Sequence, residues 1–328
     1  MKEPQPLDFE KPIVELQRRL QEIRDHSDEH ALDFDAEVEA MEAKIETTRR
    51  EIYGKLSAWQ RVQIARHTQR PFALDYVERC FTNWNELHGD RLFGDDKAMP
   101  CGIAMLGEQR CIVITHQKGR NTKENVMRNF GCAHPEGYRK ALRLMQLGEK
   151  FNLPVISLID TPGAYPGIGS EERHIAEAIA VNLREMMNLR VPVLAAVIGE
   201  GGSGGALGIG VADHVMILEN AYYSVISPEA CSAILWKDRR HAAEAAEALK
   251  LTGQDLMKLN VVDEIVAEPD GGAHRDHEKA AQILGEALRS NLKRLLKTPI
   301  NQLLKKRYEK FRRLGNFAEP PKGNGATG

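Results

Sequence analysis

The most informative segment of this chain is Val191-Pro-Val-Leu-Ala-Ala-Val-Ile198, followed at once by Gly199-Glu-Gly-Gly-Ser-Gly-Gly-Ala-Leu-Gly-Ile-Gly210. An apolar strand that ends in successive glycines and turns into a helix leaves backbone N–H groups uncovered, with no side chain in the way. Because the first amides of a helix attract negative charge, this segment predicts a site for an anion or for a developing negative charge.

A dinucleotide site is one interpretation of these residues. Gly199, Gly201 and Gly204 match the GxGxxG fingerprint, and Glu219 follows about 20 residues after the first glycine, where a ribose-binding acid is expected. The helix that could begin here has room for only about two turns, which is short for a helix that carries a pyrophosphate. The spacing alone leaves this interpretation open.

Two further interpretations share the same loop. Gly201, Ser203 and Gly205 match the GxSxG nucleophile elbow of a serine hydrolase. The residues that could complete its triad are Asp213, Asp263 and His274. The other interpretation needs no side chain, because the N–H groups of Gly204 and Gly205 would form an oxyanion hole.

A second loop repeats the design. The apolar segment that begins at Pro154 ends in Thr161-Pro-Gly-Ala-Tyr-Pro-Gly167, and one helix is expected over 170–189. The strand starts at Pro154 and Pro192 are about one βαβ unit apart. Two such loops at neighbouring strand ends can enclose one small reactive group, which favours the oxyanion hole.

Composition limits the class of protein. The chain has 328 residues, 42% of them apolar, and 45 basic residues stand against 47 acidic ones, so no overall field attracts nucleic acid. No apolar run approaches the roughly 18 residues of a membrane span, and the N-terminus lacks a secretory core, which predicts a cytosolic protein. An odd number of cysteines without CxxC spacing predicts neither disulfides nor a zinc site.

The chain divides into three predicted parts: an N-terminal helical arm over 1–60, a main α/β domain over 61–295 and a basic C-terminal tail over 296–328. The arm is expected to form a helical hairpin, interrupted at 26–30 and packed on another surface. It is either a solvated arm folded over its own core or a partner-binding arm. The tail is amphipathic and its last residues, 320–328, are expected to be disordered. Its aromatic residues, Tyr308 and Phe311, leave a nucleic-acid contact as a minor alternative.

Within the main domain the pattern alternates between strands and helices, which indicates a layered α/β fold. A helix is predicted over 72–87 and a hairpin around Gly107-Glu-Gln109. A strand pair is predicted over 214–218 and 222–227, and a last strand over 261–266. The aromatic and apolar residues after the glycine loop are expected to pack in the core or an interface rather than contact a ligand; they are Tyr222, Tyr223, Ile226 and Trp236.

Five strings in this order together resemble the alpha subunit of the bacterial acetyl-coenzyme A carboxylase carboxyltransferase. They are His116-Gln-Lys-Gly-Arg120, Asp160-Thr-Pro-Gly-Ala-Tyr-Pro-Gly167, Gly199-Glu-Gly-Gly-Ser-Gly-Gly-Ala206, Tyr223-Ser-Val-Ile-Ser-Pro-Glu229 and Gly271-Gly-Ala-His-Arg275. The resemblance runs from Leu7 to about Arg275. It implies a crotonase-like fold, a spiral of ββα units with an N-terminal helical extension.

The resemblance also implies a reaction and its partners. The family transfers a carboxyl group from carboxybiotin, held on a biotin carboxyl carrier protein, to acetyl-CoA, which gives malonyl-CoA for fatty-acid synthesis. The alpha chain is expected to act only in an α2β2 assembly with a zinc-ribbon beta subunit, alongside biotin carboxylase. No metal and no covalent cofactor are expected on this chain.

Site residues follow from the resemblance. The amides of Gly204 and Gly205 are expected to form the oxyanion hole. The wall of a biotin slot is expected from Pro162, Gly163 and Ala164, with a structural turn as the alternative. Lys118 and Arg120 are candidates for a coenzyme A phosphate or an acidic partner, with a solvated turn as the alternative, and His274 with Arg275 could hold an interface or cap the last strand. A serine hydrolase and a noncatalytic scaffold remain alternatives.

Overall fold

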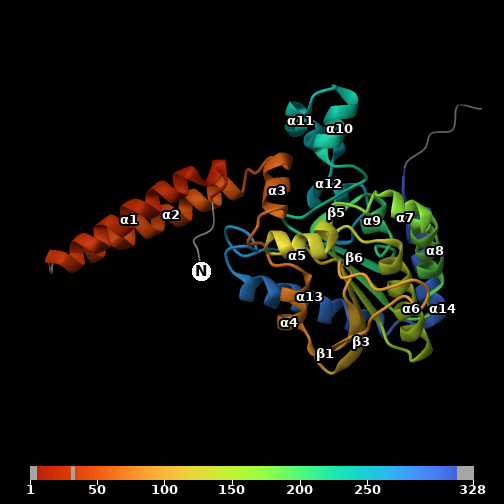
Figure 1. Cartoon of the computed structure of the whole chain (residues 1–328). Helices are drawn as coiled ribbons and strands as arrows, with labels where there is room; N and C mark the ends of the chain where they lie inside the picture. The colour runs from red at the N-terminus through yellow and green to blue at the C-terminus, as the bar shows by residue number, and fades with distance from the viewer. Residues whose placement is uncertain (1–5, 31–33, 316–328) are drawn as a thin grey trace, which may run out of the picture.

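The computed structural model describes residues 6–30 and 34–315, and a mixed β-sheet lies at its centre (Figure 1). Within this described part, eight strands join one sheet in the order β1-β2-β3-β4-β5-β6-β8, and β7 pairs with β5. The strands are β1 (Thr82–Glu86), β2 (Cys101–Leu106), β3 (Gln109–Thr115), β4 (Val155–Thr161), β5 (Val193–Gly202), β6 (His214–Leu218), β7 (Tyr222–Ser224) and β8 (Glu264–Val266). The first three strands pair antiparallel and the remaining pairs are parallel, so the α/β prediction is confirmed.

The two central strands, β4 and β5, are buried along their whole length. Parallel strands that are covered on both faces have nearly continuous apolar sequences. The stretches 155–159 and 193–198 have this composition. Pro154 and Pro192 stand directly before the two strands, where a missing backbone N–H costs no ladder bond. The strand starts predicted from these prolines are therefore confirmed.

Helices cover both faces of the sheet (Figure 1). On one face, α6 (Pro135–Lys150) contacts β2 and β3, α8 (Ile175–Asn188) packs on α6, and α14 (Ile300–Arg312) packs on α8. On the other, α4 (Ala73–Cys80) contacts β4 and α13 (His277–Leu295) contacts β5 and β8. The smaller helices are η1 (Asp8–Glu10), α3 (Ala58–Ala65), α5 (Thr122–Met127), η2 (Asn129–Gly131), α7 (Ile168–Glu172), α9 (Ser203–Leu207), α10 (Pro228–Leu235), η3 (Arg239–His241), α11 (Ala242–Leu249) and α12 (Gly253–Lys258). Within the described residues, no helix is both long and apolar enough to cross a membrane.

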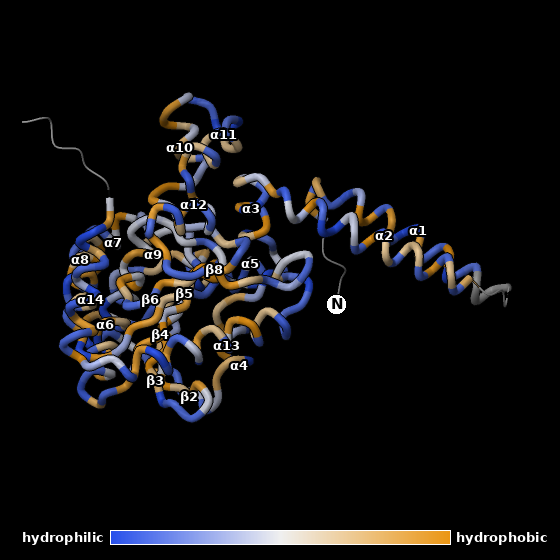
Figure 2. The backbone as a smooth tube through the Cα atoms, turned by 180° about the vertical axis from the view of Figure 1, so that it is seen from behind, coloured by the Kyte–Doolittle hydropathy of each residue, from blue (hydrophilic) through white to orange (hydrophobic). Residues whose placement is uncertain are grey.

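The N-terminal arm consists of α1 (Lys11–His30) and α2 (Asp35–Tyr53), which form the predicted hairpin. The hairpin projects away from the sheet (Figures 1 and 2), so the alternative of an arm folded over its own core is wrong. The partner-binding arm stays a prediction. The expected break at 26–30 is also wrong, because α1 continues through these residues. At the base of the arm the buried Glu10 accepts hydrogen bonds from Tyr53 Oη, at 2.8 Å, and from the Arg275 guanidinium, at 2.6 Å. Arg275 thus joins the arm to the body.

The single helix predicted over 72–87 is wrong in its second half. α4 ends at Cys80, and the extended backbone of Phe81 leads into β1, which pairs antiparallel with β2. The Trp84 ring covers Gly102, where a Cβ atom would lie 2.8 Å from the ring. Tertiary pairing with β2 therefore overrides the local helical pattern.

The strand pair predicted from 214–218 and 222–227 forms differently. β7 does not pair with β6 but extends the far end of β5, with Glu200 opposite Tyr222 and Gly202 opposite Ser224. The helix predicted over 170–189 is interrupted at His174, whose φ is +63°. The pairing of β7 with β5 brings the 222–225 segment beside the glycine loop.

The C-terminal helix α14 is part of the body rather than a free tail. Arg307 is 1% exposed, and its guanidinium donates to Asp213 at 2.7 Å and to the carbonyls of Met186, Leu189 and Val191. Phe311 packs against the core, while Tyr308 is 59% exposed. The predicted boundaries at 60 and 295 stay a prediction, and the expected disorder of 320–328 lies outside the described residues.

Candidate active site

The two glycine-containing loops predicted to lie side by side do so at the carboxyl ends of β4 and β5. Thr161 pairs with Gly201 across the two strands. A Cβ atom at Gly202 would lie 2.2 Å from the carbonyl oxygen of Pro162, and one at Gly205 would lie 2.4 Å from the Ala164 nitrogen. Glycine is therefore required at positions 202 and 205, because the backbone of one loop rests on the other.

The amides at the start of α9 have no acceptor. The first N–H groups of a helix cannot bond within it, and among the described residues those of Gly204 and Gly205 donate to no other group. Tyr138, buried in α6, donates a hydrogen bond from its hydroxyl to the Gly205 carbonyl at 3.1 Å and so holds α9 in place. Ser203, the first residue of α9, has φ +54°, a strained conformation for a residue other than glycine.

An apolar groove of about 340 Å³ lies beside Gly204. Its lining residues come from α9, the β7 segment and the 249–261 segment, and they are Ser203, Gly204, Leu207, Tyr223, Ser224, Val225, Leu249, Lys250, Leu256, Leu259 and Val261. Tyr223 packs against the core as expected, and it also borders this groove. The predicted wall, Pro162 to Ala164, is not part of the groove lining, because it packs against Gly202 and Gly205 instead.

Lys118 follows β3, the strand next to β4, and its ammonium is held inside the protein. Nζ lies 2.6 Å from Asp160 Oδ1 and 2.9 Å from Glu200 Oε1, and the Lys118 side chain is 13% exposed. Burial lowers the pKa of this amine, but the two carboxylates outweigh burial and raise it. The predicted phosphate contact of Lys118 stays a prediction, and this internal pairing argues against it.

Glu200 stands in the middle of a buried network. Its second oxygen accepts hydrogen bonds from Arg66 Nε at 2.8 Å and from Tyr222 Oη at 2.6 Å. Burial raises the pKa of the Glu200 carboxyl, but the charges of Lys118 and Arg66 outweigh it and lower the pKa to about 2. Glu200 is therefore ionised at neutral pH and serves as an anchor for the loop rather than as a proton donor.

Arg120 is partly exposed, but its guanidinium is bound to neighbouring segments of the chain. Its guanidinium pairs with Asp75, donates to the carbonyls of Thr68 and Arg70, and lies 3.9 Å from the centre of the Phe72 ring. These contacts tie the turn after β3 to the segment before α4. The predicted phosphate contact of Arg120 is untested, and the contacts give it no support.

The residues of the predicted hydrolase triad do not meet. Ser203 Oγ makes no hydrogen bond to a histidine within the described chain, and Asp213 is held by Arg307. Asp263 is paired with a lysine of α14. His274 is 5% exposed and lies 4.0 Å from a carboxylate at the base of the arm. Within the part of the chain that the structure describes, Ser203 therefore has no hydrogen-bonded histidine to act as its base, which argues against the hydrolase.

The dinucleotide interpretation also lacks its parts. α9 has five residues, which is too short for the helix that carries a pyrophosphate in that motif. The Glu219 carboxylate accepts a bond from the backbone amide of Glu268 at 3.4 Å instead of facing open space. Among the described residues, no group of three or more histidine, cysteine, aspartate or glutamate side chains is arranged to hold a metal ion.

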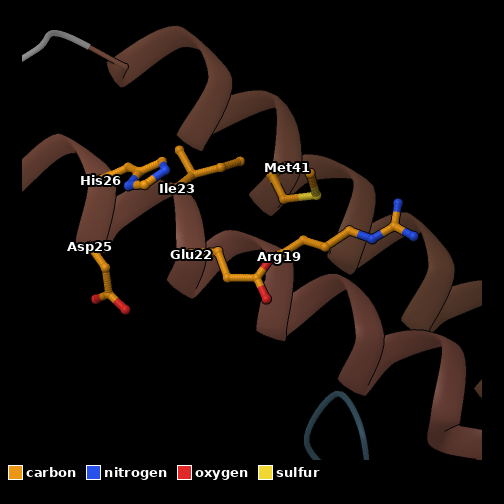
Figure 3. Close-up of a pocket in the computed structure, with 6 residues that line it drawn as sticks. All are labelled: Arg19, Glu22, Ile23, Asp25, His26 and Met41. Atoms are coloured by element: carbon orange, nitrogen blue, oxygen red, sulfur yellow. The ribbon is translucent and has the colours of Figure 1, made fainter.

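A second hollow, of about 590 Å³, lies far from these loops, along the arm (Figure 3). Figure 3 shows Ile23, His26 and Met41 facing one another between α1 and α2, while Glu22 and Asp25 point outward. This hollow is the open seam of a two-helix hairpin, and it contains no part of the glycine loops.

Comparisons with known proteins identify the family. A sequence model described as "Acetyl co-enzyme A carboxylase carboxyltransferase-like" matches residues 6–315. The chain belongs to this family. Curated relatives include the acetyl-coenzyme A carboxylase carboxyl transferase subunit alpha of Geobacter metallireducens, 56% identical over 95% of this chain and 98% of the relative. The same subunit of Thermus thermophilus is 52% identical over 96% of this chain and 100% of the relative. The resemblance seen in the five strings is confirmed, and the chain is a carboxyltransferase subunit of the alpha type.

Solved structures share the fold. A transcarboxylase 12S structure has a TM-score of 0.53 at 15% identity, and the match covers 78% of this chain and 44% of that one. The beta subunit of Pseudomonas aeruginosa geranyl-CoA carboxylase has a TM-score of 0.52 at 17% identity, with 81% of this chain and 48% of that one covered. These likenesses concern the fold alone, and they confirm the crotonase-like class.

Proposed function

We propose that this chain is the alpha half of a two-chain carboxyltransferase that moves a carboxyl group from carboxybiotin to acetyl-CoA and so forms malonyl-CoA. The observation that carries the site assignment is the pair of unused amides at Gly204 and Gly205, with Gly204 bordering an apolar groove. The transfer places negative charge on a ureido oxygen of one substrate and on the thioester oxygen of the other. Amides of this kind can stabilise such a charge without reorganising.

The hole is proposed to hold the ureido oxygen of the biotin ring. A fused bicyclic ring presents apolar carbons and one polar ureido edge, and the groove offers apolar side chains next to the Gly204 amide. Each amide donor aimed at a developing oxyanion contributes about 3 kcal/mol to the lowering of the barrier. Gly163 and Ala164 act on this site through Gly205, and Pro162 acts through Gly202, because their backbone atoms lie against these glycines.

The printed names of the relatives describe an alpha subunit, which supports the proposal of a beta partner. We propose a zinc-ribbon beta subunit, an α2β2 assembly and a biotin carboxyl carrier protein loaded by biotin carboxylase, all in the cytoplasm. The beta subunit would bind most of coenzyme A and supply a second hole for the thioester oxygen. Biotin would arrive on its carrier, with no cofactor attached covalently to this chain.

Co-purification with the beta subunit, followed by an assay in the reverse direction, tests the proposal. The assembly is expected to release acetyl-CoA from malonyl-CoA in proportion to added free biotin, and each chain alone is expected to be inactive. If the purified assembly forms no acetyl-CoA in a biotin-dependent way, the proposed reaction is refuted.

A further inference from the structure

Three charged side chains lie under the two loops, at the carboxyl ends of three neighbouring strands. Lys118 follows β3, Asp160 is in β4, and Glu200 is near the end of β5. The side chains of Asp160 and Glu200 are 2% and 9% exposed. The ammonium therefore bridges two carboxylates out of water, one just before each loop.

One oxygen atom of Asp160 connects the two strands directly. Oδ1 accepts the Lys118 ammonium at 2.6 Å and also the backbone N–H of Glu200 at 2.9 Å. A Cβ atom at Gly199 would lie 2.5 Å from the same oxygen, so the backbone of β5 approaches it closely. Asp160 therefore fixes the spacing between β4, which leads to 162–164, and β5, which leads to 202–205.

The two carboxylates differ in how far they depend on Lys118. Glu200 has a second cation, Arg66, at 2.8 Å. Among the ion pairs within residues 6–30 and 34–315, Lys118 is the cation paired with Asp160. A buried carboxylate that has lost its cation turns toward solvent, and this movement disturbs the bond to the Glu200 amide.

We propose that Lys118 is a positioning residue of the carboxyl-transfer site, because its ammonium holds Asp160 and Glu200 together and thereby sets Gly205 against the 162–164 loop. It touches no substrate, which distinguishes this role from the phosphate contact. The proposal rests on the proposed function, since it assigns Lys118 a part in placing the Gly204 and Gly205 amides. A displacement of about 1 Å at a reacting centre lowers the rate by about 10²-fold, so the expected effect is on kcat.

The test compares variants of the αβ assembly in the biotin-dependent release of acetyl-CoA from malonyl-CoA. Lys118→Met is expected to lower kcat at least tenfold and to change the KM of malonyl-CoA less than twofold. The double variant Lys118→Met/Asp160→Asn removes both charges and keeps an oxygen that can accept the Glu200 amide. It is expected to regain a large part of the lost kcat, which a phosphate-binding lysine would not do.

Charge-preserving swaps provide the matched control. The Arg307–Asp213 pair is also buried, but it lies at the opposite end of β5, where Asp213 accepts the Val193 amide at 2.7 Å. Lys118→Arg is expected to lower kcat by threefold or more because the longer side chain displaces the loops, whereas Arg307→Lys is expected to lower the melting temperature and leave kcat unchanged. These two variants also decide the question if Lys118→Met does not assemble.

Three results would overturn the proposal: a wild-type kcat in Lys118→Arg, an equal loss of kcat in Arg307→Lys, or no recovery in a folded double variant. A raised KM for malonyl-CoA with unchanged kcat would assign Lys118 to phosphate binding instead. Failure of the proposed function is recognised separately, because the wild-type assembly would then be inactive in the same assay.

Discussion

The contact between the two loops can be tested with one methyl group. A Cβ atom at Gly205 would lie 2.4 Å from both the Ala164 nitrogen and the Gly163 carbonyl carbon, which are backbone atoms that cannot rotate away. Ordinary contacts of this kind are near 3.4 Å or longer, so Gly205→Ala must separate the loops by about 1 Å. Overpacking of this degree costs about 1 to 3 kcal/mol of folding free energy.

Gly204→Ala is the matched control for stability. The nearest atom to a Cβ there is Ile179 Cδ1 at 3.7 Å, an ordinary contact, and both substitutions keep the amide N–H and add the same helix propensity. We therefore expect Gly204→Ala to keep the unfolding free energy of the wild type within about 0.5 kcal/mol. The difference between the two variants isolates the displacement of the loops.

The assay for Gly205→Ala is the biotin-dependent release of acetyl-CoA by the αβ assembly, after thermal denaturation has shown that the variant is folded. We expect a loss of about 10²-fold in kcat, since the loops separate by about 1 Å. Gly94→Ala, where a Cβ meets nothing within 4 Å, is expected to have wild-type activity. Wild-type stability and kcat in Gly205→Ala would contradict this prediction, because the amides would then not depend on this contact.

Three further predictions concern the same region. Ser203→Ala is expected to keep kcat within about threefold, whereas removing a covalent nucleophile costs about 10⁶-fold, so a loss of that size would restore the hydrolase. The folded-state pKa of Glu200, about 2, is below its ordinary 4.5, so Glu200 stabilises the fold above pH 4.5 and this contribution is lost as the pH falls toward 2. Denaturant unfolding should show the gap between wild type and Glu200→Gln closing over that range, and a constant gap would contradict the assignment. Leu259→Trp should raise the KM of biotin several-fold by filling the groove, while Leu296→Trp, at a comparably exposed site outside it, should not.

The positions of the two loops could be predicted from the sequence because the residues that determine them are local. Pro154 and Pro192 mark the entries of the two buried strands, and the glycines that follow those strands mark where the backbone must approach another chain segment closely. The same reasoning failed over 72–87. Apolar residues have helical spacing there, but Trp84 packs over Gly102 in the sheet instead. A local sequence pattern does not indicate that β1 will pair with β2, which lies about 20 residues further along the chain.

The role of Lys118 could not be predicted for a related reason. A lysine next to a glycine and an arginine in a turn is typical of phosphate contacts, but its partners are 42 and 82 residues away along the chain. Only the parallel order of β3, β4 and β5 brings them together. The signal that could have pointed to this pairing is the presence of an acidic residue at the end of two otherwise apolar strands, since a buried carboxylate requires a partner.

The groove was missed because no single segment contains it. It needs the pairing of β7 with β5, which brings Tyr223 beside Ser203, and it needs the 249–261 segment to pack alongside. One side of α9 is closed by the 162–164 loop, which rests on Gly205, and the other side opens to the groove through Gly204. We therefore expect a ligand to reach the Gly204 amide from the groove side. Substitutions that narrow the groove should act on binding, and those that move the 162–164 loop should act on kcat.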